Sequence, residues 1–353
     1  MKKEESVALQ GFAVLMMLVP HFFLDVSIYP DNFFLFPEAF QRFAWMGRMC
    51  VGIFSFLSGY GMYQVLKKKS SFGRMVADCA KRLVRLYAKL FLVIILCVYL
   101  PRLLMGEEIL ISQLPGNLFG YNPVYNGAWW FVFQYLWFMI LAPVLGIIMN
   151  SRVSKVVRFL LVFVLFAVLL FGKGIIPSNA GVVEFFEVRM QPTFLFIFTE
   201  GFVAGKMQEF EDWPKCWGKD KGFIGRVRCP LVGVVLCMTA LVLRYLYSSD
   251  PNKVNADLLL VPTLCCGASL LFRSKYSIKN VLAFFGINSL YLWFVHILVY
   301  DRLWLFLSQK VEYWFVFYII LLMVSLGVSI LLRYIEKIIK KFCRCIWHRT
   351  GII

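Results

Sequence analysis

Long apolar runs separated by short basic segments dominate this sequence. We find ten of them, at residues 7–24, 44–66, 86–105, 128–149, 157–176, 192–206, 229–247, 257–272, 282–306 and 314–335. A helix needs about 20 apolar residues to cross a bilayer. Because 61% of the 353 residues are apolar and only 16% are charged, the chain has too few charges for a water-soluble surface of this size. We therefore expect an all-α fold, a transmembrane bundle of about ten helices that forms a single integral-membrane domain over residues 1–353.

The basic residues indicate how this bundle is oriented. The net charge is +17, and a cytoplasmic N-terminus places 28 of the 37 Lys and Arg residues in cytoplasmic segments and 9 on the other side. Such a bias is typical of cytoplasmic loops. Removing the weakest run, 192–206, changes the split to 17 against 20 and abolishes the bias. The sequence predicts ten spans with both termini cytoplasmic, and the clustering of charge in loops argues against a nucleic-acid partner.

Ionisable side chains inside apolar helices are costly and mark candidate functional positions. His21 lies in the outer half of the first run, and Asp25 follows four residues later. On one helix face, a carboxylate at that spacing could orient the imidazole as a general base. The alternative is a buried histidine bonded to a backbone carbonyl that Pro20 leaves free. His296 favours a helix–helix hydrogen bond, and Glu200 favours a capping contact near the end of its run, although a functional role stays open for both.

Two arginines form a candidate anion site. Arg82 and Arg85 are three residues apart, so they lie on one helix face, and their guanidinium groups could hold phosphate by forked hydrogen bonds. The alternative is an anchor to the membrane surface. The sequence has no glycine-rich phosphate loop, no nucleophile elbow around Ser58 and no Cys-x-x-Cys pair, so we expect no bound metal or cofactor.

Five segments together resemble the integral-membrane acyltransferase-3 family. Gly11 and His21 in the first run are similar to its first-helix motif, and residues 47–60, which end in Leu-Ser-Gly-Tyr, resemble its second helix. Residues 81–85 match an Arg-x-x-Arg motif. The last two segments are Trp129-Trp130-Phe131 with Ala142-Pro143, and Gly-x-x-Ser leading to a histidine over residues 286–296. One departure stands out: the family usually has Arg or Lys eleven positions before the histidine, where this chain has Gln10, and Arg48 does not obviously replace it.

The resemblance implies a multi-pass enzyme of a bacterial plasma membrane. It would transfer an acyl group, with acetyl as the expected one, from cytoplasmic acyl-CoA to a hydroxyl of a surface or lipid-linked glycan. His21 would be the catalytic base, helped by Asp25, and Arg82 and Arg85 would bind the donor. Acceptor-binding or supporting roles would fall to Gln10, Arg48, Ser58, Tyr121, Trp129, Trp130, Glu200 and His296. Acyl-CoA is then a co-substrate, and the expected partners are the glycan acceptor and membrane lipid.

Two other classes of protein stay open. A transporter or flippase of glycans or lipids would also contain buried His and Glu, although it would not need Arg82 and Arg85 beside a CoA-sized cavity. An inactive scaffold in a polysaccharide synthesis complex is the third class, for which Gln10 is the one indication.

Overall fold

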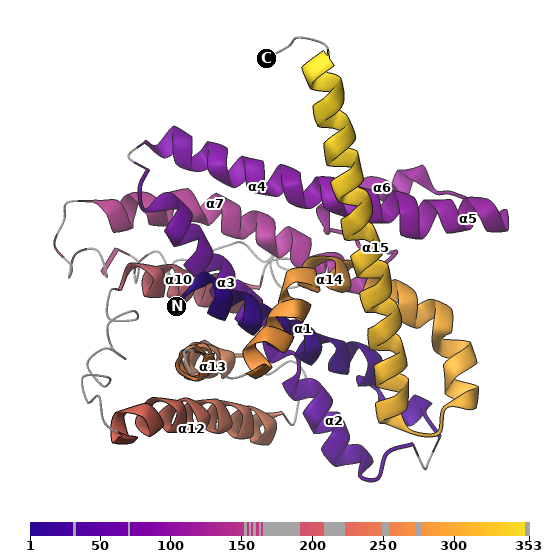
Figure 1. Cartoon of the computed structure of the whole chain (residues 1–353), viewed down its shortest axis with the longest axis horizontal. Coiled ribbons are helices and arrows are strands. Elements are labelled where there is room, and N and C mark those ends of the chain that lie inside the picture. The colour runs from indigo at the N-terminus through magenta and orange to yellow at the C-terminus, as the bar shows by residue number, and fades with distance from the viewer. Residues whose placement is uncertain are drawn as a thin grey trace, which may run out of the picture.

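The protein is a bundle of helices (Figure 1). The computed structural model describes residues 1–30, 33–69, 71–151, 191–207, 223–248, 254–272 and 277–349, with a few single positions between 154 and 164. No strand occurs among these residues, which confirms the all-α prediction for them. The helices are α1 (Lys3–Phe23), η1 (Val26–Ile28), α2 (Pro37–Met46), α3 (Met49–Leu66), α4 (Phe72–Val93), the π-helical η2 (Ile94–Tyr99), α5 (Leu100–Met105), η3 (Ile111–Gln113), α6 (Leu114–Phe119), η4 (Gly127–Trp129), α7 (Trp130–Asn150), α10 (Pro192–Lys206), α12 (Phe223–Tyr247), α13 (Asp257–Phe272), α14 (Ser277–Lys310) and α15 (Trp314–Arg349).

Within the described part of the chain, seven helical stretches are long and apolar enough to cross a membrane, so the chain is a multi-pass membrane protein. They coincide with seven of the ten predicted spans and are Lys3–Phe23, Pro37–Leu66, Phe72–Met105, Gly127–Asn150, Pro230–Tyr247, Ile278–Trp304 and Trp314–Cys343. The predicted spans 192–206 and 257–272 coincide with α10 and α13, which have only 15 and 16 residues. Helices of that length reach roughly 23 Å, less than a hydrocarbon core of about 30 Å. The predicted span 157–176 lies almost wholly outside the described residues, so the count of ten stays a prediction, as does the orientation of the termini.

Two glycines let α1 and α14 approach each other closely. A Cβ atom on Gly11 would lie 1.8 Å from the carbonyl oxygen of Leu282, and one on Gly286 would lie 1.8 Å from that of Val7. Only glycine fits where two backbones meet in this way. The helices run in the same direction, because the contact between Gly11 and Gly286 is followed further along both helices by one between His21 and His296. Each histidine follows its glycine by ten residues, so the close approach brings both imidazoles to the same height.

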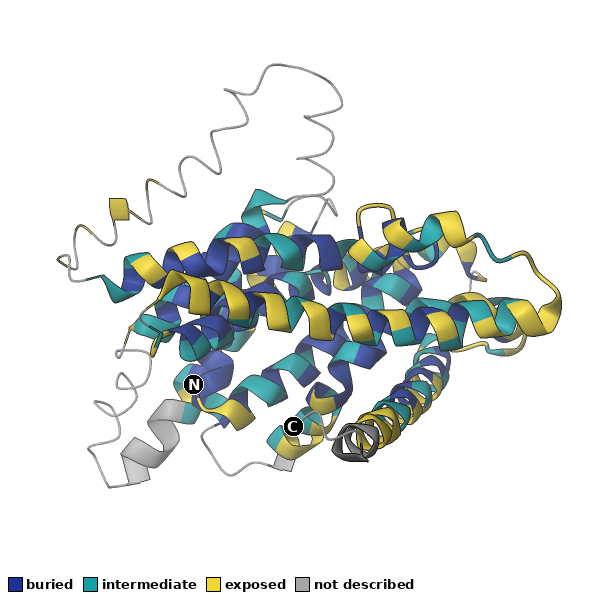
Figure 2. Cartoon of the chain, turned by 90° about the horizontal axis from the view of Figure 1, so that it is seen from above, coloured by how far each residue is buried: buried dark blue, intermediate teal, exposed yellow. Residues whose placement is uncertain are grey.

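Aromatic side chains fill the space beyond the C-terminal end of α1. Phe22 stacks on Tyr300 with ring centroids 5.6 Å apart, and Tyr29 meets Trp304 edge-on at 4.9 Å. We call this group the aromatic cap; its members are Phe22, Phe23, Tyr29, Phe33, Phe34, Phe40, Tyr300, Trp304, Trp314, Phe317 and Tyr318. Figure 2 shows buried positions gathered in the interior of the bundle, while the outer helices carry rows of exposed positions. The aromatic cap closes this interior at one end.

Candidate active site

A cavity of about 470 Å³ lies among α1, α3, α4, α7 and α14. It brings together six of the residues that the sequence nominated: Gln10, His21, Ser58, Arg82, Arg85 and Trp130. Gln10 and His21 both line it from α1, and eleven residues of helix separate them by about 16 Å. The cavity is therefore elongated along the helices, with room for an extended ligand.

One end of the cavity is cationic. Arg82, Arg85 and Lys89 line it from α4, and their spacing of three and four residues places them on one helix face. Tyr135 of α7 also lines the cavity and is in contact with Arg82. No carboxylate occurs among the described residues that line this space, so the cavity favours an anion.

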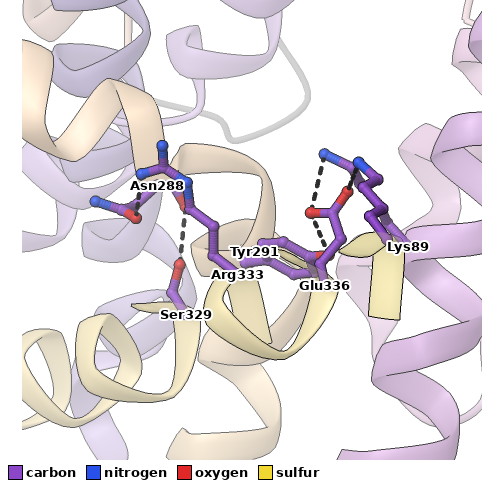
Figure 3. Close-up of polar contacts among 7 residues, drawn as sticks. Lys89, Asn288, Tyr291, Ser329, Arg333 and Glu336 are labelled. Carbon is purple, nitrogen blue, oxygen red and sulfur yellow. Dashed lines mark hydrogen bonds and ion pairs between the residues drawn. The ribbon is translucent and has the colours of Figure 1, made fainter. Parts of the chain in front are cut away.

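Glu336 of α15 forms an ion pair with Lys89 (Figure 3). Its carboxylate lies 3.6 Å from the Lys89 ammonium group and accepts a hydrogen bond of 3.0 Å from the Tyr291 hydroxyl. Beside this group, the Arg333 guanidinium donates to the side-chain oxygen of Asn288 at 3.3 Å, and the Ser329 hydroxyl donates to the Asn288 carbonyl at 3.0 Å. These bonds connect α15 to α14 and, through Lys89, to the cationic end of the cavity.

The histidines mark the other end, because His296 follows by five residues of α14 the tyrosine ring over which Lys89 lies. The ring centroids of His21 and His296 lie 4.8 Å apart, with the ring planes at 63°. His21 is half-buried and lines the cavity, whereas His296 is fully buried and does not. The Nδ1 atom of His296 lies 2.9 Å from the Trp293 carbonyl oxygen and 3.2 Å from that of Leu292. His21 is therefore the imidazole that a ligand in the cavity can reach.

Aromatic rings flank the histidine end. Trp130, Phe131 and Trp293 line the cavity, and the Trp293 indole donates a hydrogen bond of 3.2 Å to the Ala128 carbonyl. Trp129 faces the other way: it is fully buried and donates to the Phe294 carbonyl at 3.1 Å. The adjacent tryptophans thus have different positions, because Trp129 fastens the start of α7 to α14 while Trp130 faces the ligand space.

Asp25 does not orient His21. The sequence placed both on one helix face, but α1 ends at Phe23, and Asp25 is an exposed residue that caps the short helix η1. Its carboxylate accepts hydrogen bonds from the backbone N–H and the hydroxyl of Ser27, at 2.9 Å and 2.6 Å. These bonds hold the pKa of Asp25 below its ordinary value. The shared helix face was a wrong prediction, because the helical spacing stops before it reaches Asp25.

Three further nominated residues lie outside the cavity lining. Tyr121 is exposed after α6, and Glu200 lies in α10 with one carboxylate oxygen buried without a hydrogen-bond partner. Arg48, which precedes α3, is close enough to act electrostatically on His21. The structure therefore brings Arg48 near the histidine end and leaves Tyr121 and Glu200 apart from it.

Sequence reasoning missed several residues of the structure. Lys89, Tyr135, Ser289 and Trp293 line the cavity, and of these Lys89 could have been found, because it follows Arg85 by one helical turn. A buried ion pair between Arg244 and Asp257, with Nε and Oδ1 2.7 Å apart, joins α12 to α13 and was also missed. Among the described residues, no group of three His, Cys, Asp or Glu side chains is arranged to hold a metal ion.

One of three comparisons with known proteins finds a match to this chain. The acyltransferase domain that defines the acyltransferase-3 family matches residues 7–334, which include every residue lining the cavity. No curated protein and no solved structure matches the chain. Since the matched segment covers nearly the whole chain, from within α1 into α15, the protein belongs to the acyltransferase-3 family and is a membrane acyltransferase.

Proposed function

We propose that this protein is an O-acyltransferase of a bacterial plasma membrane. It would move an acyl group, with acetyl as the expected one, from cytoplasmic acyl-CoA to a hydroxyl of a surface or lipid-linked glycan. The observation that supports this most is the elongated cavity, which has Arg82, Arg85 and Lys89 toward one end and His21 toward the other. Acyl-CoA carries phosphates at one end and a thioester at the other. It could therefore lie along the cavity with its phosphates at the cations and its thioester near His21.

The cationic end is suited to the CoA phosphates. Arginine presents a planar fork of donors that matches phosphate oxygens in pairs, and both Arg82 and Arg85 line the cavity. Lys89 adds a compact positive charge one turn further along α4. With the phosphates held there, the flexible pantetheine arm would extend along the cavity and bring the thioester toward His21.

His21 would act as the general base. A ring nitrogen of His21 takes the proton from the acceptor hydroxyl while the hydroxyl oxygen attacks the thioester carbonyl carbon. The new C–O bond forms, the C–S bond breaks, and the imidazolium returns its proton to the departing CoA sulfur. All atoms and protons balance without an acyl-enzyme intermediate or a bound cofactor.

Exclusion of water is the other requirement, because water competes with the glycan hydroxyl for the thioester. Trp130, Phe131 and Trp293 supply apolar walls near His21, and Phe22 of the aromatic cap packs beside His296, with ring centroids 6.3 Å apart. The tryptophan faces also offer a surface on which a sugar ring could stack. These features support an acceptor that enters at the histidine end.

The test is acyl transfer by the purified protein. We expect detergent-solubilised protein to release CoA from acetyl-CoA only when a glycan acceptor is present, and to form an acetyl ester on that glycan. His21→Ala should slow transfer by about 10²–10⁴-fold, the usual contribution of a general base. We expect Asp25→Asn to keep most of the rate, because the Asp25 carboxylate bonds Ser27 and not His21.

Other outcomes would contradict the proposal. Near-normal turnover by His21→Ala would eliminate the base, and a loss from Asp25→Asn as large as that from His21→Ala would restore Asp25 as the orienting group. Vesicles that move glycan or lipid across the bilayer without any CoA release would identify a transporter or flippase instead.

A further inference from the structure

The neighbour of His21 in the bundle interior is a second imidazole. His296 lies with its ring centroid 4.8 Å from that of His21, in an edge-on arrangement. The pairing follows from the packing of α1 against α14, which the backbone contact at Gly11 and Gly286 fixes. A residue in this position can act on the base without touching the substrate.

Hydrogen bonding determines the tautomer of His296. Its Nδ1 atom faces two backbone carbonyl oxygens, of Trp293 and Leu292, at 2.9 Å and 3.2 Å. A carbonyl only accepts, so Nδ1 must carry the hydrogen, and in a neutral imidazole Nε2 then bears the lone pair. That Nε2 atom is buried and has no hydrogen-bond partner. An acceptor in this state requires a donor, since an unsatisfied buried polar atom costs about 1–3 kcal/mol.

We propose that His296 is a positioning residue whose Nε2 atom accepts a hydrogen bond from the ring N–H of His21. His21 is the histidine whose ring packs against His296, with the ring centroids 4.8 Å apart. The bond would hold the His21 proton on the nitrogen that faces His296. The other His21 nitrogen then keeps its lone pair toward the cavity, which is the form a general base needs.

The proposal also explains why this site can function without Asp25. In catalytic triads a carboxylate holds the histidine in the correct tautomer. A buried carboxylate is costly inside a membrane bundle, whereas a neutral imidazole accepts the same hydrogen bond without a net charge. His296 cannot be the base itself, because it is fully buried and does not line the cavity.

The inference rests on the proposed function of His21, so its primary test does not depend on activity. The chain has three histidines, His21, His296 and His348, and ¹⁵N-histidine labelling in detergent micelles reports the tautomer of each. Single substitutions, His348→Gln among them, assign the signals. In the wild-type protein we expect His296 to be protonated at Nδ1 and His21 to populate one tautomer. In His296→Met we expect His21 to populate both.

Kinetics give the second readout. His296→Met should lower kcat by about 10- to 100-fold, the range for losing a group that orients a functional histidine, with the KM for acyl-CoA unchanged. His296→Gln, whose amide oxygen can accept in place of Nε2, should recover a large part of kcat.

Each result that contradicts our expectation identifies which of the two proposals is wrong. Mixed His21 tautomers in the wild-type protein, or an unchanged His21 signal in His296→Met, overturn the inference even if the enzyme is active. Equal losses in the Met and Gln variants, with lowered thermal stability in both, would assign His296 to packing. Absence of acyl transfer by a wild-type protein with a single His21 tautomer would overturn the proposed function and leave the hydrogen bond in place.

Discussion

Arg85 offers a test of the proposed donor site, because it lines the cavity and is the most exposed of its three cations, so a substitution there should disturb the packing least. Arg85→Lys keeps the charge and loses the forked geometry. Charge-assisted hydrogen bonds contribute about 1.5–3 kcal/mol, so we expect the apparent KM for acyl-CoA to rise about tenfold to a hundredfold. The KM for the acceptor should change much less. Steady-state kinetics with each substrate varied in turn measure both.

A matched control exists on the same helix. Arg74 of α4 is exposed and does not line the cavity, so Arg74→Lys should leave the KM for acyl-CoA unchanged. If Arg85→Lys behaves like Arg74→Lys, the arginines at 82 and 85 serve only to anchor the helix to anionic lipid.

Side-chain chemistry in the sequence predicts only part of this site. The rarity of ionisable residues in apolar runs singled out His21 and His296, and helical spacing singled out Arg82 and Arg85. The same spacing failed for Asp25, because the helix ends before it and Ser27 binds its carboxylate. The contact between His21 and His296 could not be derived from the sequence, since the two residues are 275 positions apart and meet only through the packing of their helices.

The packing of α1 against α14 depends on glycine at one crossing point. A Cβ atom at Gly11 would lie 1.8 Å from a backbone oxygen of α14, and backbone cannot rotate away as a side chain can. We expect Gly11→Ala to separate the helices. The expected loss in the free energy of unfolding is about 1–3 kcal/mol, the typical cost of overpacking. Thermal unfolding in detergent measures this effect. Gly61→Ala is the control, because nothing beyond the neighbouring backbone of its own helix lies within 4 Å of its Cβ position, and equal stability of both variants would contradict the close approach.

The C-terminal helix α15 is joined to the cavity by Glu336. Glu336→Leu removes the ion pairs with Lys89 and Lys340 and the hydrogen bond from Tyr291, whereas Glu336→Gln can still accept from Tyr291. The ion pair is partly exposed and contributes at most about 1 kcal/mol. We therefore expect Gln to lower thermal stability slightly and Leu to lower it more.

The control for Glu336 is the exposed lysine one turn later. Lys340→Gln leaves Lys89, Tyr291 and Glu336 in place, so it should have the smallest effect of the three substitutions. A loss from Lys340→Gln equal to that from Glu336→Leu would show that Glu336 does not fasten α15 to the bundle.

The orientation of the complete chain in the membrane is testable with reporters. The sequence predicts both termini in the cytoplasm, from the split of 28 against 9 basic residues. We expect a reporter that is active only in the cytoplasm to be active when fused after Lys340. A reporter that is active only outside the cell, giving a signal at the same position, would overturn this topology.

The sequence predicts the helical fold better than it predicts the number of spans. The long apolar runs predict an all-α fold. Among the described residues, seven of these runs coincide with helices that are long enough to span a membrane. The short helices α10 and α13 show why the number of apolar runs does not give the number of spans. Helix α3 packs against α10, and α12 packs against α13. Because other helices cover them, their length need not match the thickness of the bilayer. Hydropathy alone does not separate burial in lipid from burial in protein.

The cavity draws its walls from residues as early as Gln10 and as late as Trp293. During synthesis, α1 would enter the membrane long before α14 exists, so His21 and His296 meet only when the chain is nearly finished. Until then the cationic helix α4 has no closed chamber beside it. A growing chain therefore cannot assemble this cavity, which is complete only when the last helices have packed against the first.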